Sequence, residues 1–89
     1  IKTLRAEIDS LDFELLDILK QRMNLAIEVA KRKKEKNIPI LQIKRLNEMI
    51  QKRLENAKGS ELDEEFIKDI FESIHQESIR IQNEIFKEK

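Results

Sequence analysis

An apolar seam runs along residues 3–37 and limits the folds open to this chain. The segment contains neither Gly nor Pro, and apolar residues recur along it at alternating spacings of four and three. This period is typical of one helix face that packs against other helices. The seam consists of Leu4, Ile8, Leu11, Leu15, Ile18, Leu25 and Val29, and the cations Arg22 and Lys33 occupy two further seam positions.

A helix over residues 3–37 is too long to be covered by the rest of its own chain. At about 1.5 Å per residue it extends for roughly 50 Å, whereas a compact chain of 89 residues has a radius of gyration of ~12 Å. The remaining residues are too few to bury it along its length. We therefore predict an intertwined homodimeric helical bundle, in which the long helices of two chains pack together and the shorter helices cover them.

A second, shorter helix is predicted over residues 40–58. The residue before Pro39 avoids the helical region, and proline is well tolerated in a first helical turn. Gly59, the only glycine, stands where a left-handed residue would end the helix. The apolar positions of this helix are Ile43, Leu46, Ile50, Leu54 and Ala57.

A third helix is predicted over residues 63–87, with Asp63 as its N-cap, as Thr3 is for the first helix. Its apolar face is interrupted by Ser78 and Gln82, which are one turn apart. Three helical patterns without a strand pattern predict an all-α fold class. The length of 89 residues fits one domain that spans the whole chain.

Composition argues against several classes of partner. Lys and Arg total 18, as do Asp and Glu, so no net field attracts the chain to nucleic acid or to anionic membranes. The sequence has no cysteine, no apolar run that could span a bilayer and no signal-peptide pattern. We therefore expect a cytoplasmic protein. No metal-ligand cluster, glycine-rich phosphate loop or activated nucleophile is visible, so a reaction here would need mainly orientation and electrostatics.

Four polar side chains in seam positions predict a site for a polar ligand: Arg22, Lys33, Ser78 and Gln82. Buried polar groups cost free energy unless they are paired, so several in one core either form a network or surround a ligand. Arg22 and Lys33 share a helix face and are ~16 Å apart along the axis, which suits a small molecule with two anionic ends. The alternatives are snorkelling side chains, an internal ion pair or interhelical hydrogen bonds.

Residues outside the seam extend this hypothesis. Arg5 lies some 25 Å from Arg22 along the axis and on a different face, so it can reach the same pocket only from a partner chain. On the second helix, Arg45 lies next to the apolar line and Gln42 lies about one turn before it. By default Arg5 and Arg45 would be surface residues. His75 has no partner at metal spacing and is expected to be structural or exposed to solvent.

Three segments carry a family resemblance: LRAEIDSLDFELLDILKQRMNLAIEVAKRKK, IPILQIKR and ESIRIQNEIF. Over nearly the whole chain, they resemble the all-helical chorismate mutases. The resemblance implies conversion of chorismate to prephenate in phenylalanine and tyrosine biosynthesis, without metal or cofactor, in a homodimer whose partner chain completes each site. The segment LNEM resembles a subgroup fused to DAHP synthase, an enzyme of the shikimate pathway, in which this domain also carries a feedback signal.

The resemblance implies catalytic roles for three residues. Lys33 and Gln82 would donate to the ether oxygen of chorismate, and Arg22 would bind a carboxylate. The reaction is a concerted pericyclic shift that requires no proton transfer and no covalent bond to the protein. Catalysis would then consist of holding the dianion in a chair-like conformation and stabilising the negative charge that develops on the ether oxygen.

The resemblance also implies substrate-binding residues, and it includes one departure. The binding residues would be Arg5 from the partner chain, Gln42, Arg45 and Ser78. Members of the family commonly have Glu after the helix-two arginine, where it helps hold the substrate hydroxyl, but this chain has Leu46. Glu48 is about one turn from Arg45 but about 60° round the helix from it, so as a candidate to replace the missing Glu it points in a different direction. Gln42 and a backbone group are the other candidates for binding the hydroxyl.

Two other functions remain open from the sequence. Isochorismate pyruvate lyase has the same fold and tolerates an apolar residue after the helix-two arginine. A non-catalytic helical dimerisation domain, or a prephenate-sensing regulatory domain of a bifunctional DAHP synthase, would keep the apolar seam. Such a domain would need no particular cation at the four basic positions considered above, which are Arg5, Arg22, Lys33 and Arg45.

Overall fold

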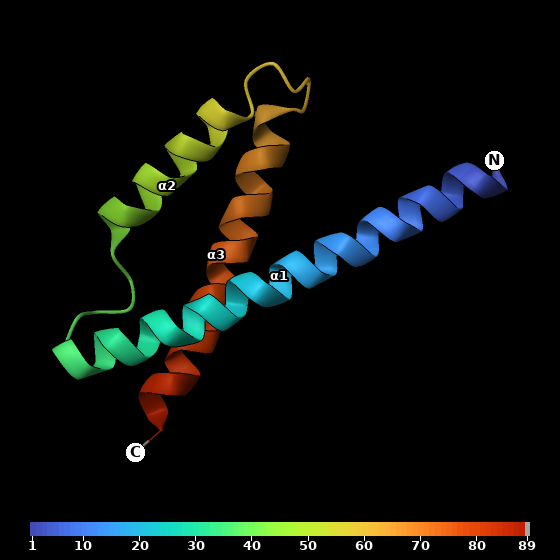
Figure 1. Cartoon of the computed structure of the whole chain (residues 1–89). Helices are drawn as coiled ribbons and strands as arrows, with labels where there is room; N and C mark the ends of the chain where they lie inside the picture. The colour runs from blue at the N-terminus through green and yellow to red at the C-terminus, as the bar shows by residue number, and fades with distance from the viewer. Residues whose placement is uncertain (89) are drawn as a thin grey trace.

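The structure, a computed structural model, describes residues 1–88, and these form three α-helices without a strand. Helix α1 spans Lys2–Lys36, α2 spans Ile43–Asn56 and α3 spans Glu64–Lys87. Helix α3 packs against both of the others: α1 crosses it and α2 runs beside it (Figure 1). The all-α fold class, with one long and two shorter helices, is therefore confirmed.

The ends of the first helix differ slightly from the prediction. Helix α1 begins at Lys2, so Thr3 lies inside the helix, and Ile1 takes the N-cap position without a side-chain hydrogen bond. The predicted cap at Thr3 is wrong. At the other end Asn37 adopts the left-handed conformation (φ 56°), so the helix ends at Lys36 and the chain reverses direction.

The second helix is shorter at both ends than the predicted range of 40–58. Gln42 at its N-cap is extended (φ −124°, ψ 97°), so the segment after Pro39 becomes helical only at Ile43. The helix ends at Asn56 with a right-handed cap residue. Gly59 is indeed left-handed (φ 83°), but it lies in the following turn and does not cap the helix.

Asp63 caps α3 as predicted. Its carboxylate accepts a hydrogen bond of 3.0 Å from the backbone N–H of Phe66. This bond satisfies one of the amides that a helix start leaves without an intrahelical partner. The cap fixes the point at which α3 turns back along α2.

We expect Asp63→Ala to lower the free energy of unfolding by about 1 kcal/mol, because the amide loses its acceptor. Asp63→Asn keeps an acceptor oxygen at the same position and should lose much less. Urea denaturation followed by circular dichroism measures both variants. Equal losses in the two would contradict a role for Asp63 as a cap.

The core lies along α3, which packs against the C-terminal half of α1 and against α2. Its buried apolar residues are Ala26, Ala30, Met49, Ile50 and Ile67. Next to this core, the Lys34 ammonium donates to the carbonyl of Ile85 at 3.2 Å and to that of Glu88. A cation at a helix C-terminus is favourable, so Lys34 ties α1 to the end of α3.

The N-terminal half of α1 projects as an arm away from the other two helices (Figure 1). Its seam is exposed within the single chain, and Leu11, for example, is 62% exposed. The radius of gyration is 15.9 Å, well above the ~12 Å of a compact chain of this length. In residues 1–88, no helix is both long enough and apolar enough to cross a membrane.

Candidate active site

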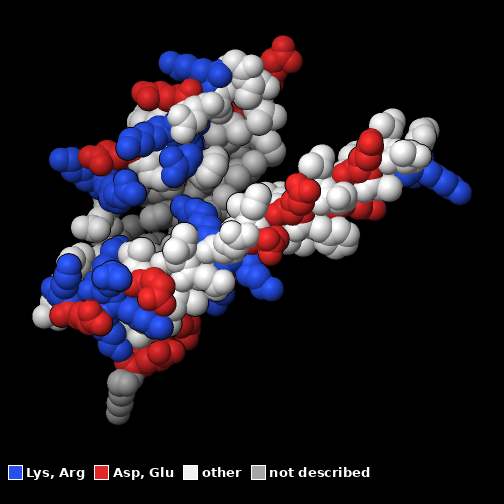
Figure 2. Space-filling model, viewed as in Figure 1, with Lys and Arg blue, Asp and Glu red and all other residues white. Residues whose placement is uncertain are grey.

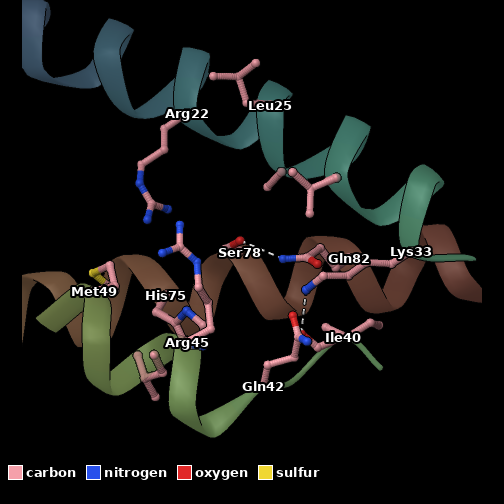
Figure 3. A pocket seen from close by; sticks show the side chains of 13 residues that line it. Arg22, Leu25, Lys33, Ile40, Gln42, Arg45, Met49, His75, Ser78 and Gln82 are labelled. Carbon is pink, nitrogen blue, oxygen red and sulfur yellow. Dashed lines mark hydrogen bonds between the residues drawn. The ribbon is translucent and has the colours of Figure 1, made fainter. Parts of the chain in front are cut away.

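A cleft of about 240 Å³ lies between the C-terminal half of α1, the start of α2 and α3. It brings together side chains that are far apart in the sequence and come from all three helical regions (Figure 3). Six of the predicted site residues line it: Arg22, Lys33, Gln42, Arg45, Ser78 and Gln82. The apolar part of the cleft wall includes Leu25, Ala26, Val29, Ile40 and Met49.

Of the three other residues considered from the sequence, one lines the cleft and two lie outside it. Leu46 lines the cleft, so an apolar side chain occupies the position where a carboxylate was expected from the resemblance. Glu48 is exposed and does not line the cleft. Arg5 lies on the projecting arm, outside the cleft of its own chain.

Positive charge gathers around the cleft without acidic neighbours. Its lining contains three cations and no Asp or Glu, and none of these cations forms a salt bridge within residues 1–88. In Figure 3 the guanidinium groups of Arg22 and Arg45 point toward one another, and in Figure 2 blue side chains border the hollow between α1 and α2. Cations held together without counter-ions favour the binding of an anion.

Arg22 is partly buried at this site. Burial and, to a smaller extent, repulsion from Arg53 lower the pKa of the Arg22 guanidinium from its usual value. An arginine nevertheless stays charged at physiological pH. Arg53 is itself held over the ring of Phe71, 5.7 Å from the centroid. The Arg22 charge therefore lies in a region where water screens it less than at an open surface.

Lys33 is held in place by the turn that follows α1. The left-handed Asn37 reverses the chain, and the N–H of Ile38 donates to the carbonyl of Lys33 at 2.8 Å. The same turn places the carbonyl of Ile40 2.8 Å from the Lys33 ammonium, which donates to it. Burial, followed by repulsion from Arg45, lowers the pKa of Lys33. An ammonium has three donors, so Lys33 can also bind a ligand.

Ser78 and Gln82 are buried and bonded to each other, as expected for polar residues on the inward face of the third helix. They are 7% and 5% exposed. The Gln82 Nε2 atom donates to Ser78 Oγ at 2.9 Å, and Gln82 Oε1 is buried without a hydrogen-bond partner in residues 1–88. This pair supplies neutral hydrogen-bonding groups to a cleft that is otherwise cationic and apolar.

His75, which was expected to be structural or exposed to solvent, also lines the cleft. Its Nε2 atom is buried and has no hydrogen-bond partner among the described residues. Burial and repulsion from Arg22 and Lys33 lower the pKa of His75, so the imidazole is neutral at pH 7. One sequence signal could have placed it: His75 precedes Ser78 by three residues and therefore shares its helix face. Within residues 1–88 no group of His, Cys, Asp or Glu could hold a metal ion.

Comparisons with known proteins identify the family of the chain. The family model described as chorismate mutase type II matches residues 4–83. The chain is 30% identical over 83 residues to the 4-amino-4-deoxychorismate mutase of Streptomyces venezuelae, with 93% of this chain and 81% of that protein covered. It is 34% identical over 83 residues to the bifunctional chorismate mutase/prephenate dehydratase of Buchnera aphidicola, with coverage of 93% and 22%.

A third relative is the T-protein of Haemophilus influenzae, 33% identical over 84 residues, with 94% of this chain and 22% of that protein covered. The chain thus spans most of the Streptomyces protein but only about a fifth of the two longer relatives. No solved structure matches the chain at a significant level. Because the family model covers residues 4–83, from the arm of α1 to the end of the cleft, the chain belongs to the type II chorismate mutase family.

Proposed function

We propose that the cleft is the active site of a chorismate mutase, which rearranges chorismate to prephenate on the route to phenylalanine and tyrosine. The observation that carries this proposal is the set of three cations without counter-ions around an apolar cleft that also contains a buried Ser78–Gln82 pair. Chorismate is a dianion with an apolar ring, an ether oxygen and one hydroxyl. Its two negative charges match the cations of the cleft, and its ring matches the apolar side chains.

The carboxylates would be bound by the two arginines of the cleft. Arg22 and Arg45 come from different helices and point toward one another, so they can hold a dianion between them (Figure 3). A guanidinium binds a carboxylate through two parallel hydrogen bonds in one plane, which restricts how the substrate can rotate. Ser78 would assist at a carboxylate. Restriction to a chair-like conformation lowers the entropy cost of reaching the transition state.

The developing charge on the ether oxygen would be stabilised by Lys33 and Gln82. Lys33 donates one hydrogen bond to Ile40 and keeps donors for the substrate. Half a turn of the Gln82 amide would let the Ser78 hydroxyl donate to Oε1, which leaves Nε2 free to donate to the ether oxygen. Once the amide has turned, both donors are in place before the reaction starts, so they need little reorganisation as charge moves onto the oxygen.

We further propose that the site is completed by a second copy of the chain. Residues 6–19 of the arm contain five carboxylates and no Lys or Arg, whereas residues 31–36 contain five basic residues and one Glu. Antiparallel packing of two α1 helices would cover the exposed seam and bring these opposite charges together. It would also bring the partner's Arg5 to the cleft, where it would add a fourth cation.

We expect Leu11→Glu to convert the dimer to a monomer, because it places a charge in the centre of the exposed seam. The released arm should lose helical content, since an isolated helix of this length is marginal in water. Ser10→Glu adds the same charge on the neighbouring, non-seam face and should remain dimeric. Sedimentation velocity and circular dichroism measure both effects. A Leu11→Glu protein that stays dimeric would contradict packing through the seam.

The activity is tested by product analysis with three substrates. Chorismate should give prephenate, and isochorismate should give no pyruvate; release of pyruvate would favour the lyase. The amine of 4-amino-4-deoxychorismate is cationic at neutral pH, and the cleft offers it three cations and no carboxylate. We therefore expect chorismate to be the better substrate. Binding of prephenate without turnover of any substrate would instead support a regulatory module.

We also propose that the domain acts in the cytoplasm as part of a longer polypeptide that carries DAHP synthase. The segment LNEM at the start of the second helix, residues 46–49, supports the fusion through its resemblance to that subgroup. The absence of cysteine fits a reducing compartment. Sequencing of the gene that encodes this chain would test the fusion directly.

A further inference from the structure

The Nε2 atom of His75 is a polar group that the proposed reaction leaves without a role. It is buried within the described chain and forms no hydrogen bond there, and it belongs to a residue that lines the cleft. A ligand therefore reaches this atom only when a side chain that covers it shifts. A buried polar atom without a partner costs free energy, and such an atom at a binding site is explained when a ligand supplies the partner. The His75 ring extends from α3 on the side that faces the start of α2 (Figure 3).

Chorismate has one polar group that the proposed contacts also leave without a partner. Its carboxylates are assigned to cations and its ether oxygen to Lys33 and Gln82. The remaining group is the ring hydroxyl, which is neutral and needs an acceptor for its hydrogen. None of the described carboxylates lines the cleft to accept it, and Leu46 presents only carbon.

We propose that His75 is a specificity-determining residue whose Nε2 atom accepts a hydrogen bond from the ring hydroxyl of chorismate. This assignment rests on the proposed function. Burial beside Arg22 and Lys33 keeps the ring neutral at pH 7. Neutral imidazole has one nitrogen that donates and one that accepts, so this bond requires the tautomer with its proton on Nδ1. The bond would satisfy an orphan acceptor and the substrate hydroxyl together.

Gln42 is the competing acceptor for this hydroxyl. Its side chain is exposed and water already satisfies it, so a substrate contact would only replace one hydrogen bond with another. His75 gains a bond that the free protein lacks. The two assignments therefore predict different results when each side chain is replaced by leucine.

The test compares chorismate with an analogue in which hydrogen replaces the ring hydroxyl. His75→Leu should lower kcat/KM for chorismate about tenfold, which is typical of one lost hydrogen bond, and should leave kcat/KM for the analogue almost unchanged. Gln42→Leu should not change the ratio between the two substrates. Gln76→Leu changes the neighbouring exposed residue of α3 and controls for effects on the helix.

Each outcome decides between the assignments. Equal losses on both substrates in His75→Leu would overturn the role of His75, because a residue that only supports packing cannot distinguish the hydroxyl. A ratio that changes in Gln42→Leu but not in His75→Leu would assign the hydroxyl to Gln42 and also overturn it. If the wild type neither binds nor rearranges chorismate, the proposed function fails together with this inference. Turnover with an unaltered ratio in both variants overturns the inference alone.

Discussion

Lys33→Met is expected to lower kcat/KM for chorismate by about 10³-fold, because it removes the cation proposed to donate to the ether oxygen of the breaking bond. Methionine keeps the apolar stem of the side chain and loses the ammonium. The Lys33 ammonium also holds the carbonyl of Ile40, so the variant is expected to have a looser connection between α1 and α2. Steady-state kinetics and thermal unfolding should be measured on the same preparations.

Lys31→Met is the matched control, since it removes a lysine from the same basic run. Lys31 is exposed, pairs with Glu28 at 3.5 Å and does not line the cleft. Its loss should change kcat/KM by less than about twofold. If the two variants lost activity equally, the rate would depend on the general charge of the run and not on Lys33.

The Lys33 charge also predicts how activity varies with pH. Burial and Arg45 lower the pKa of Lys33 below its ordinary value of 10.5. The profile of kcat/KM, which reports ionisation in the free protein, should therefore fall as the pH rises through a value below 10.5. Lys33→Arg should move this decline to higher pH, because arginine stays protonated. An unchanged profile in Lys33→Arg would exclude Lys33 as the titrating group.

Arg5→Ala is expected to lower kcat/KM by about 10²-fold although Arg5 lies far from the cleft of its own chain. Arg22→Ala should be at least as severe. When the two inactive variants are unfolded together and refolded as a mixture, each mixed dimer contains one site with both wild-type arginines. The mixture should recover about a quarter of wild-type activity, because half of the dimers are mixed and half of their sites are intact.

A double variant, with both substitutions in one chain, is the control for this experiment. When it is refolded with wild-type protein, each mixed dimer has one altered residue in each site, so it should add no active sites. Recovery in the mixture of single variants is possible only if Arg5 acts across the dimer. Activity that remains at the level of the separate variants would contradict a shared site.

Much of the fold could be predicted because the local patterns are strong. Alternating spacings in the seam, Pro39 and the Asp63 cap predicted three helices, and the observed ends differ from the predicted ones by at most three residues. The errors at the ends arose where the chain did not follow local preference. Helix α1 starts before Thr3 without a side-chain cap, and α2 starts only after an extended segment that lets Ile40 reach Lys33.

The candidate site was predicted less completely, for a physical reason. Charged and polar residues at seam positions stand out in a sequence because an apolar face should not contain them, so Arg22, Lys33, Ser78 and Gln82 could be recognised. His75 stands beside the seam, and its proximity to the cations depends on how α1 crosses α3. Such a crossing is set by tertiary packing, which spacing within one helix does not report.

The most direct test of the proposed activity is the rate at which the purified protein converts chorismate, with the product identified by NMR. Wild-type protein should consume chorismate far faster than the uncatalysed reaction and give prephenate, and Arg22→Ala should remove nearly all of the enhancement. Wild-type protein that binds prephenate but leaves chorismate to its uncatalysed rate would contradict the assignment of the cleft as a catalytic site.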